Sequence, residues 1–228
     1  MDFSSFRLLA AGADLSMEPD ARADADGVEL RMDFAKEPLT QLAAYDGELP
    51  VLVTNRVDWE GGEAGDTAKR LDDLTRAVEH DAVTAVDIEL AALEGESEHD
   101  ATHVVDHARE HGASVVVSTH DFESTPDRDA IAARLRRACE HGDVGKMATT
   151  AESADDVLAM LGATRELTAD GEQVATMCMG EPGRHSRAVA PLYGSRIGYA
   201  PVDPEEATAP GQYDLATLRS LVTRLQSG

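Results

Sequence analysis

Short apolar runs and longer helical patterns alternate along this chain, and this alternation limits its fold more than any other feature. Runs rich in β-branched residues, each as long as a strand, are followed by segments with apolar residues at helical spacing. Strands that alternate with helices pair in parallel through right-handed crossovers. Strands are predicted at residues 6–11, 28–34, 51–55, 83–90, 114–119, 144–148, 173–179 and 197–199, and the clearest helices at 65–80, 102–111, 127–141, 153–161, 186–193 and 215–226.

Eight strand–helix units in 228 residues average about 28 residues each, which suits a compact (β/α)8 barrel. A doubly wound open sheet is the alternative, but it would normally carry a glycine-rich phosphate motif after an early strand, and none is present. No domain boundary, linker or low-complexity segment stands out in the chain. The sequence therefore predicts one α/β domain, a single (β/α)8 TIM barrel over residues 1–228.

Two helix starts carry recognisable capping patterns. Thr125 followed by Pro126 is typical of an N-cap and first helical residue, and predicts a helix that opens at Pro126. Ser153 is followed three residues later by Asp156, which resembles a capping box.

The charge balance is strongly acidic, with 44 Asp and Glu against 20 Lys and Arg, a net charge of −24 and a pI near 4.5. Such a chain is repelled by nucleic acid and by anionic membranes, so neither is an expected partner. Disorder is not expected, because 42% of the residues are apolar and the charges are interspersed. A folded protein with a dense, lysine-poor carboxylate surface indicates the cytosol of a salt-accumulating halophile.

Compartment and metal content are predicted from the remaining composition. No segment reaches the length of apolar residues that spans a membrane, and the N-terminus lacks the pattern of a signal peptide. Cys139 and Cys178 have no metal-ligand spacing and are interpreted as small buried side chains. We expect a reduced, cytoplasmic protein with no cofactor and no metal.

Polar residues gather at the predicted strand ends. In a barrel of this type the chemistry lies at the carboxyl ends of the strands and in the loops that follow them. A single polar residue there is commonly part of a salt bridge, whereas a whole set indicates an active site. In chain order the set is Glu29, Arg31, Arg56, Glu60, Asp87, Glu89, His120, Lys146, Arg184, Arg187, Thr208 and Gln212.

Lysine is rare in this chain, which has Lys36, Lys69 and Lys146 against 17 arginines. Lys146 lies inside a predicted strand, where lysine is unfavourable unless its amine is held or used. It could simply pair with a carboxylate or extend its amine to solvent. The functional alternative is a nucleophile that forms an imine with a carbonyl substrate.

A lysine nucleophile must be neutral, and its reference pKa of about 10.4 leaves little neutral amine at pH 7. Burial and a nearby cation such as Arg187 would lower this pKa. His120, on the neighbouring predicted strand, is the candidate base for the C–H next to the imine. A carboxylate such as Glu60 or Asp87 could fix the orientation and tautomer of the histidine.

These residues lie within segments that resemble the type I 3-dehydroquinate dehydratases. The resemblance extends from about residue 27 to the end of the chain. Six segments carry it, namely TNRVDWEGG (54–62), VDIEL (86–90), VSTHDFESTP (117–126), VGKMATTAESADDVL (144–158), MCMGEPGRHSR (177–187) and ATAPGQ (207–212).

The resemblance implies a barrel enzyme that converts 3-dehydroquinate to 3-dehydroshikimate in aromatic amino acid biosynthesis. It implies that Lys146 forms the imine, that His120 transfers protons and that Glu60 supports the histidine. It also implies a homodimer whose small-molecule partner is the substrate 3-dehydroquinate. Substrate-binding roles are implied for Glu29, Arg31, Arg56, Arg187, Thr208 and Gln212.

The sequence departs from the family pattern at a few positions. Ala11 falls near the place of a substrate-contacting serine at the end of the first strand, and Thr208 and Cys178 replace serines.

Two alternative functions share some of the features described above. A class I aldolase would also use Lys146 and would bind a phosphate near Gly180, Gly183 and Gly194, and a non-catalytic barrel would only bind a small acid.

A series of histidines, His99, His103, His107 and His111, recurs every four residues. Histidines at this spacing can chelate a metal ion. We interpret them instead as the solvated face of a helix whose Val104, Val105 and Ala108 pack inward. Trp59, beside Glu60, is interpreted as a cover over its loop rather than as a sugar-binding residue.

Overall fold

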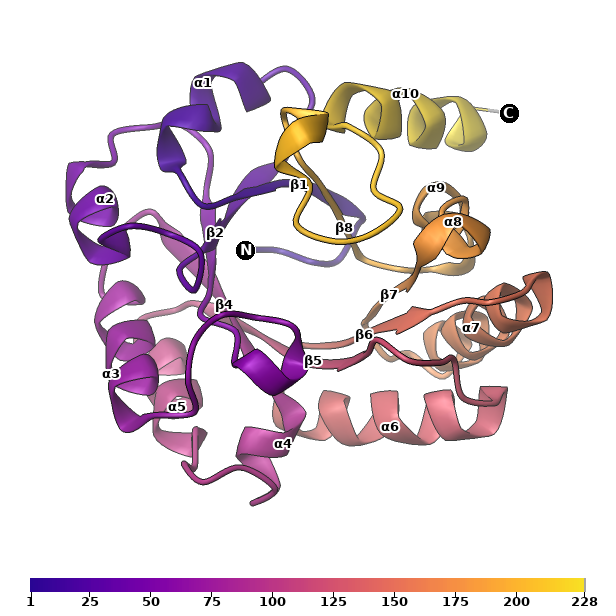
Figure 1. Ribbon diagram of the computed structural model, residues 1–228, viewed down its shortest axis with the longest axis horizontal. Coiled ribbons are helices and arrows are strands. Elements are labelled where there is room, and N and C mark those ends of the chain that lie inside the picture. The colour runs from indigo at the N-terminus through magenta and orange to yellow at the C-terminus, as the bar shows by residue number, and fades with distance from the viewer. Residues whose placement is uncertain (228) are drawn as a thin grey trace.

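The computed structural model describes residues 1–227, and in it eight parallel strands form a ring seen end-on in Figure 1. The predicted (β/α)8 barrel is confirmed. The strands are β1 (Arg7–Gly12), β2 (Gly27–Arg31), β3 (Val51–Thr54), β4 (Val83–Glu89), β5 (Ser114–Asp121), β6 (Val144–Thr150), β7 (Val174–Met179) and β8 (Ile197–Ala200).

The strands follow each other around the ring in the order β7-β6-β5-β4-β3-β2-β1-β8. β1 pairs with both β2 and β8, so the sheet curls back on itself. β7 and β8 are joined more loosely, by a hydrogen bond of 2.8 Å from the Arg196 amide to the Val174 carbonyl. The barrel is therefore nearly closed, and its strand ends converge on one mouth.

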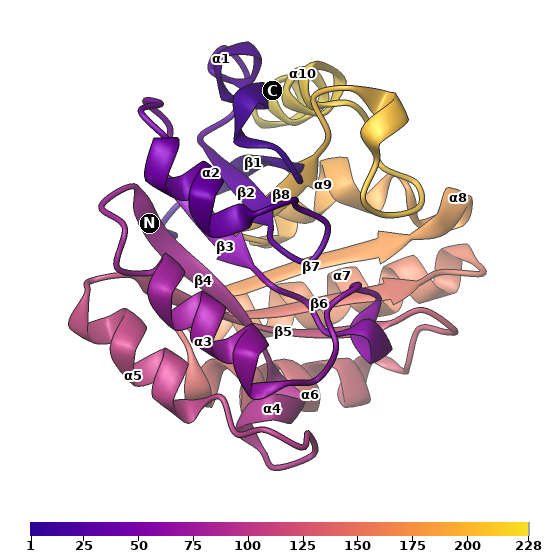
Figure 2. The same cartoon turned by 60° about the vertical axis from the view of Figure 1, so that its left-hand side comes forward.

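Helices lie outside the strands and cover them, as the turned view in Figure 2 shows. Apolar side chains from both layers form the core between sheet and helices. The helices are α1 (Glu18–Ala21), α2 (Pro38–Ala44), α3 (Ala68–Ala77), α4 (Leu90–Leu93), α5 (Thr102–Glu110), α6 (Arg128–His141), α7 (Ala154–Ala169), α8 (Gly180–Gly183), α9 (Ser186–Tyr193) and α10 (Leu215–Gln226), with 3-10 turns at Leu15–Met17, Asp58–Glu60 and Pro204–Glu206.

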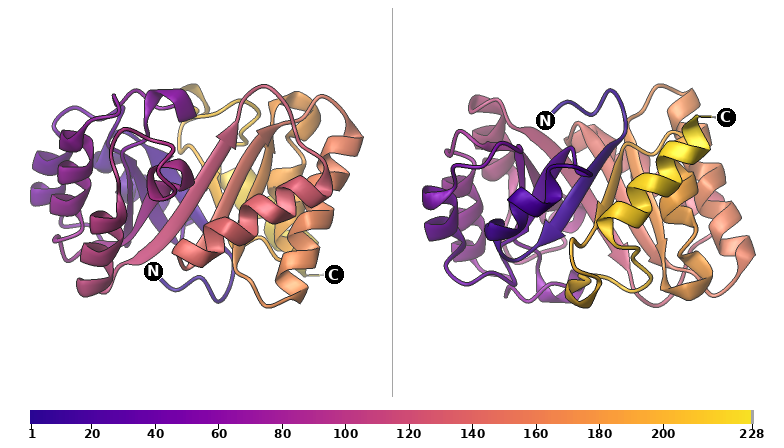
Figure 3. Two further views of the ribbon diagram at one scale, coloured as in Figure 1. Left: turned by 90° about the horizontal axis from the view of Figure 1, so that it is seen from below. Right: turned by 90° about the horizontal axis from the view of Figure 1, so that it is seen from above.

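Inside the barrel, apolar side chains fill the end where the strands begin, and polar side chains line the mouth where the strands end. The apolar part belongs to a second buried cluster, which includes Leu9, Leu52, Val116 and Ile197. The N-terminal amine of Met1 donates hydrogen bonds to the Thr84 carbonyl and to Ser114, near the starts of β4 and β5. The N-terminus therefore lies at the end opposite the strand tips, and Figure 3 shows the barrel from two sides. Because strand side chains alternate, the next inward positions bring polar groups to the mouth.

The Ser153 capping box is confirmed, with both of its hydrogen bonds present. The predicted start of α6 is wrong. Asp127 is the N-cap and accepts a hydrogen bond from the Ala130 amide, so Pro126 lies outside the helix. Thr125 instead hydrogen-bonds Thr149 and the Thr150 carbonyl, at 2.8 and 2.7 Å.

Several predicted boundaries also differ. β2 ends at Arg31 rather than at residue 34, because the amides of Phe34 and Ala35 turn back to the Arg31 carbonyl. α7 runs on to Ala169, past the predicted end at 161, since the buried face continues through Leu167. α3 is shorter than residues 65–80 because Thr67 caps it. The short helices α1, α2, α4 and α8 were not predicted.

The histidine series lies on the outside of the barrel, as expected. α5 contains His103 and His107, while His99 precedes it and His111 is its C-cap residue. Val104, Val105 and Ala108 are buried. Within residues 1–227, no three His, Cys, Asp or Glu side chains are grouped so as to hold a metal ion. In the same range no helix is long and apolar enough to cross a membrane.

Candidate active site

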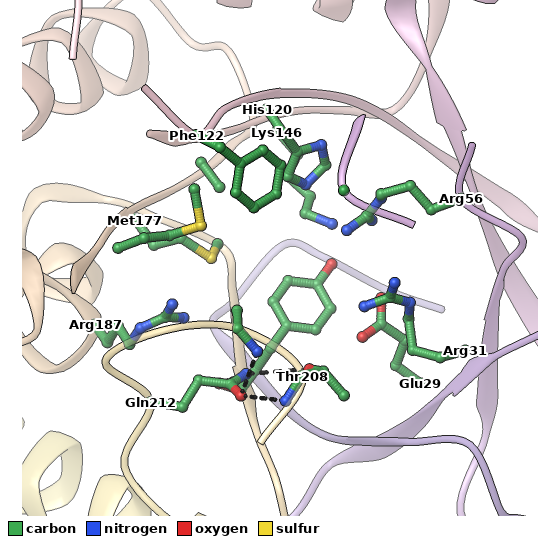
Figure 4. A pocket seen from close by; sticks show the side chains of 15 residues that line it. Glu29, Arg31, Arg56, His120, Phe122, Lys146, Met177, Arg187, Thr208 and Gln212 are labelled. Carbon is green, nitrogen blue, oxygen red and sulfur yellow. Dashed lines mark hydrogen bonds between the residues drawn. The ribbon is translucent and has the colours of Figure 1, made fainter. Parts of the chain in front are cut away.

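A pocket opens at the carboxyl ends of the strands (Figure 4). All six residues predicted to bind substrate line it, together with Lys146 and His120. Glu60 and Ala11 do not line it. The remaining lining residues are Gly61, Phe122, Ala148, Met177, Met179, Tyr199 and Ala209.

Lys146 projects into the barrel from β6 and is 3% exposed. Its Nζ donates a hydrogen bond of 2.7 Å to Oδ2 of Asp87 on β4. Ser118, on the strand between them, donates to Oδ1 of Asp87 at 2.6 Å, and Arg56 lies 3.4 Å from Oδ2. Asp87 is therefore the direct partner of the lysine, a role that the sequence had not assigned to it.

The pKa of the Lys146 amine is lowered, first by burial and then by the cation of Arg56. The sequence had suggested Arg187 as this cation. That suggestion is wrong, because the cation that lowers the pKa of Lys146 is Arg56, which also contacts Asp87. The Asp87 and Glu29 carboxylates oppose the shift. Burial alone would raise the pKa of Asp87, but Lys146 and Arg56 hold it below its ordinary value. In the free enzyme the pair is therefore an ammonium on Lys146 held by a carboxylate on Asp87.

His120 lies at the end of β5, and its Nδ1 is 2.8 Å from Oε2 of Glu60. Of the two carboxylates considered for this contact, Glu60 makes it. The 3-10 turn at Asp58–Glu60 presents Glu60, and Gly61 ends that turn with φ +76°. A Cβ at Gly61 would come within 2.2 Å of the Phe122 ring, so the turn requires glycine.

Burial shifts both members of this pair toward their neutral forms. It raises the pKa of Glu60 to about 8, with help from the Glu89 carboxylate. It lowers the pKa of His120 well below the ordinary value, helped by Arg56 and Lys146. Loss of the Glu60 proton lets Nδ1–H donate to the carboxylate, and Nε2 of His120 is then able to accept a proton.

Arg187 lies on the opposite side of the pocket from Arg56 (Figure 4). Burial lowers its pKa to about 10, and within residues 1–227 it makes no salt bridge. Its guanidinium donates to the Pro210 carbonyl at 3.2 Å, and its Nε is buried without a partner in that range. A buried guanidinium without a counter-ion suits an anionic ligand.

Glu29 and Arg31 reach the pocket from β2. Two hydrogen bonds of 2.9 and 2.6 Å to Asp33 hold the guanidinium of Arg31, which also lies over the Phe34 ring. Glu29 is 3% exposed, and burial raises its pKa. This corner can therefore both donate and accept hydrogen bonds.

The segment from Thr208 to Gln212 forms one edge of the pocket. Oε1 of Gln212 accepts hydrogen bonds from the amides of Thr208 and Ala209, at 2.9 and 3.2 Å. Gly211 has φ +76°, and a Cβ there would meet the Gly180 carbonyl oxygen at 2.6 Å. The segment therefore folds over its own glutamine and against the loop after β7.

Arg70, which the sequence reading missed, supports the site from α3. Its NH1 contacts both oxygens of Glu89 and the Asn55 carbonyl. Glu89 also accepts the Val57 amide at 3.0 Å, so this buried pair fixes the loop that carries Arg56 and Glu60. The sequence signal that could have identified Arg70 is its position on the inward face of an amphipathic helix.

Fold and site together define a (β/α)8-barrel enzyme with a buried lysine and a glutamate-supported histidine at its mouth. The family model described as type I 3-dehydroquinase matches residues 12–228. The chain therefore belongs to the type I 3-dehydroquinase family. Its activity is that of a 3-dehydroquinate dehydratase, a hydro-lyase.

Individual relatives agree with this assignment. A 3-dehydroquinate dehydratase of Haloarcula marismortui is 78% identical, covering 100% of this chain and 99% of the relative. One of Halobacterium salinarum is 50% identical over 99% and 100%. The crystal structure of 3-dehydroquinate dehydratase from Geobacillus kaustophilus superposes with a TM-score of 0.86 at 27% identity, over 98% of this chain and 92% of that one. The halophilic sources support the origin inferred from the charge balance.

Proposed function

We propose that this enzyme dehydrates 3-dehydroquinate through an imine between Nζ of Lys146 and C3 of the substrate. The carrying observation is that a buried amine, hydrogen-bonded to Asp87 at 2.7 Å, shares one pocket with a histidine held by Glu60. An amine of lowered pKa can add to a carbonyl, and a histidine beside it can remove the proton that the iminium acidifies.

Imine formation begins when the Lys146 ammonium gives one proton to Asp87. The neutral amine then adds to C3, and the electron pair of the C3–O π bond moves onto oxygen. A second proton passes from nitrogen to that oxygen, giving a carbinolamine. Asp87 returns the first proton as the C3–O bond breaks, so that water leaves and the protonated imine remains.

Elimination then uses the pair formed by His120 and Glu60. His120 removes a proton from C2, and the C2–H electron pair flows toward the iminium nitrogen to form an enamine. The enamine expels the C1 hydroxyl, which takes the proton from His120 and leaves as water. A final water hydrolyses the new imine, releasing 3-dehydroshikimate and free Lys146.

Substrate orientation follows from the charges that line the pocket. Arg187 is proposed to bind the substrate carboxylate, because a guanidinium can make two parallel hydrogen bonds to it. Glu29, Arg31 and Arg56 lie across the pocket, where they are proposed to bind the ring hydroxyls. Thr208 and Gln212 complete the enclosure, and their segment is proposed to close over bound substrate.

The remaining assignments are also proposals. We propose that residues 1–228 form one catalytic domain, that it acts as a homodimer in the reduced cytoplasm, and that its partner is the small-molecule substrate 3-dehydroquinate. No cofactor or metal takes part in the steps above, since the lysine, aspartate, histidine and water supply each group transfer.

The proposal is tested by separating imine formation from elimination. His120→Ala should lower turnover of 3-dehydroquinate by about 10²-fold or more, the usual scale for acid–base catalysis. It should still form the imine, so borohydride should trap a substrate adduct in this variant. His103→Ala, an exposed histidine on α5, is the matched control and should behave as wild type. Near-normal turnover of His120→Ala would contradict the proposed role.

A further inference from the structure

Tyr199, on β8, carries a buried hydroxyl group that has no hydrogen-bond partner among residues 1–227. The side chain points into the barrel, is 5% exposed and lines the pocket. The mechanism above does not use it. Buried hydroxyl groups are normally paired, so an unpaired one inside an active site suggests a partner that arrives with the ligand.

The ring of Tyr199 lies beside the reacting amine. Nζ of Lys146 is 4.6 Å from the ring centroid. Among the charged groups, Glu29 and Asp87 raise the pKa of the hydroxyl and Arg56 lowers it. Glu29 and Arg56 lie across the pocket from Arg187 (Figure 4), and Asp87 is the hydrogen-bond partner of Lys146, so the hydroxyl belongs to the imine-forming end of the pocket.

Packing alone does not explain the hydroxyl. A phenylalanine would fill the same space and keep the ring beside the ammonium, without a polar atom left unpaired. Tyr45 shows the ordinary arrangement in this protein, since its hydroxyl donates to the Leu49 carbonyl at 2.7 Å. The contrast indicates that the Tyr199 hydroxyl has a function in the occupied site.

We propose that the Tyr199 hydroxyl donates a hydrogen bond to the C3 oxygen of the substrate while Lys146 adds to C3. This inference rests on the proposed imine mechanism. As the N–C3 bond forms and the C3–O π bond breaks, negative charge gathers on that oxygen. The hydrogen bond stabilises the charge, and the phenol keeps its proton throughout. The oxygen then receives its protons from nitrogen and from Asp87.

Two further facts fit a donor at this oxygen. The C3 oxygen and Nζ become bonded to the same carbon, so a group beside Nζ lies near that oxygen. Burial, together with Glu29 and Asp87, raises the pKa of Tyr199 well above its ordinary value. The phenol therefore stays protonated and keeps the hydrogen that it donates. A fixed donor aimed at developing charge is a strong source of rate acceleration.

Tyr199→Phe tests the proposal because it removes the donor and keeps the ring. The measurement is the rate of adduct formation on Lys146, obtained by quenching with borohydride at successive times after mixing with 3-dehydroquinate. We expect this rate to fall by at least about 10-fold, with KM within about threefold of wild type and the melting temperature not lowered. Tyr193→Phe, an exposed tyrosine at the end of α9, is the control and should match wild type.

An unchanged trapping rate in Tyr199→Phe would overturn the proposal. So would a rise in KM with no loss of trapping rate at saturating substrate, because the hydroxyl would then serve binding alone. Failure of the underlying mechanism is distinguishable, since wild type itself would then give no adduct on Lys146.

Discussion

Nζ of Lys146 lies 2.7 Å from Oδ2 of Asp87, and both side chains are almost fully buried inside the barrel. Ser118 holds the second carboxylate oxygen at 2.6 Å, so the carboxylate is fixed as well as paired. An ion pair of this kind is costly to bury, and it is weak evidence for stability. The proposed role of the pair is chemical: Asp87 takes the proton that the amine must lose and returns it to the departing water.

Asp87→Asn should therefore slow imine formation. The amide keeps the size and can still hydrogen-bond Ser118, but it cannot take the ammonium proton. Turnover of 3-dehydroquinate should fall by about 10²-fold or more, with slower borohydride trapping on Lys146. Asp106→Asn, on the exposed face of α5, provides the control. Wild-type trapping kinetics in Asp87→Asn would remove Asp87 from the mechanism.

The Glu60–His120 pair predicts how activity depends on pH. Burial raises the pKa of Glu60 to about 8, and His120 acts as a base after Glu60 has lost its proton. In wild type kcat/KM should therefore fall on acidification below about pH 8. In Glu60→Gln, residue 60 does not titrate, so kcat/KM should begin to fall at a lower pH, and its plateau value at high pH should be reduced. A fall of kcat/KM at the same pH in both enzymes would contradict the role assigned to Glu60.

The raised pKa of Glu60 also makes the stability of the protein depend on pH. Glu60 has a higher pKa in the folded state than in the unfolded chain, so its contribution to stability is present at low pH. This contribution is lost as pH rises through about 8. The melting temperature of Glu60→Gln relative to wild type should therefore increase between about pH 5 and pH 9. A difference that stays constant or decreases would contradict the shift.

Arg187 is predicted to act in binding rather than in the chemical step. Arg187→Met removes the guanidinium proposed to hold the substrate carboxylate, so KM should rise by about 10- to 100-fold, the scale of charge-assisted hydrogen bonds. Because the guanidinium is buried without a salt-bridge partner in residues 1–227, the variant should melt no lower than wild type. A drop in kcat at unchanged KM would place Arg187 elsewhere in the mechanism.

The net charge of −24 predicts a dependence on salt. Folding brings carboxylates together, and their repulsion reaches far in dilute buffer, where the Debye length is about 30 Å at 0.01 M against about 3 Å at 1 M. Exposed ion pairs such as Arg136 with Glu166 are also screened, but each contributes only about 1 kcal/mol or less. Melting temperature and activity should both rise from tens of millimolar to molar chloride. Values that stay level or fall would contradict a salt-adapted surface.

Strand positions could be predicted from the sequence because each strand is buried on both faces and reads as a short apolar run. Helix ends were harder to predict from the sequence, because tertiary contacts decide which residue caps a helix. Thr125 is a good N-cap residue in isolation, but Thr149 and Thr150 bind its hydroxyl, and Asp127 caps α6 instead.

For the site, the sequence predicted which residues meet but only part of how they pair. Strand ends of a parallel barrel converge, so Lys146 and His120 had to share one mouth. Either Glu60 or Asp87 could have reached the histidine, and the choice depends on strand register and on the 3-10 turn at Asp58–Glu60. Tyr199 was missed because a tyrosine in a buried strand resembles an ordinary core residue.

Identification of the lysine that reacts with substrate tests the central claim most directly. Wild-type enzyme would be inactivated with borohydride in the presence of 3-dehydroquinate and mapped by peptide mass spectrometry, with Lys146→Ala as the control. The account predicts one covalent adduct, on Lys146, and no adduct or turnover in the variant. An adduct on the exposed Lys36 or Lys69, or a covalent adduct or turnover in Lys146→Ala, would contradict it.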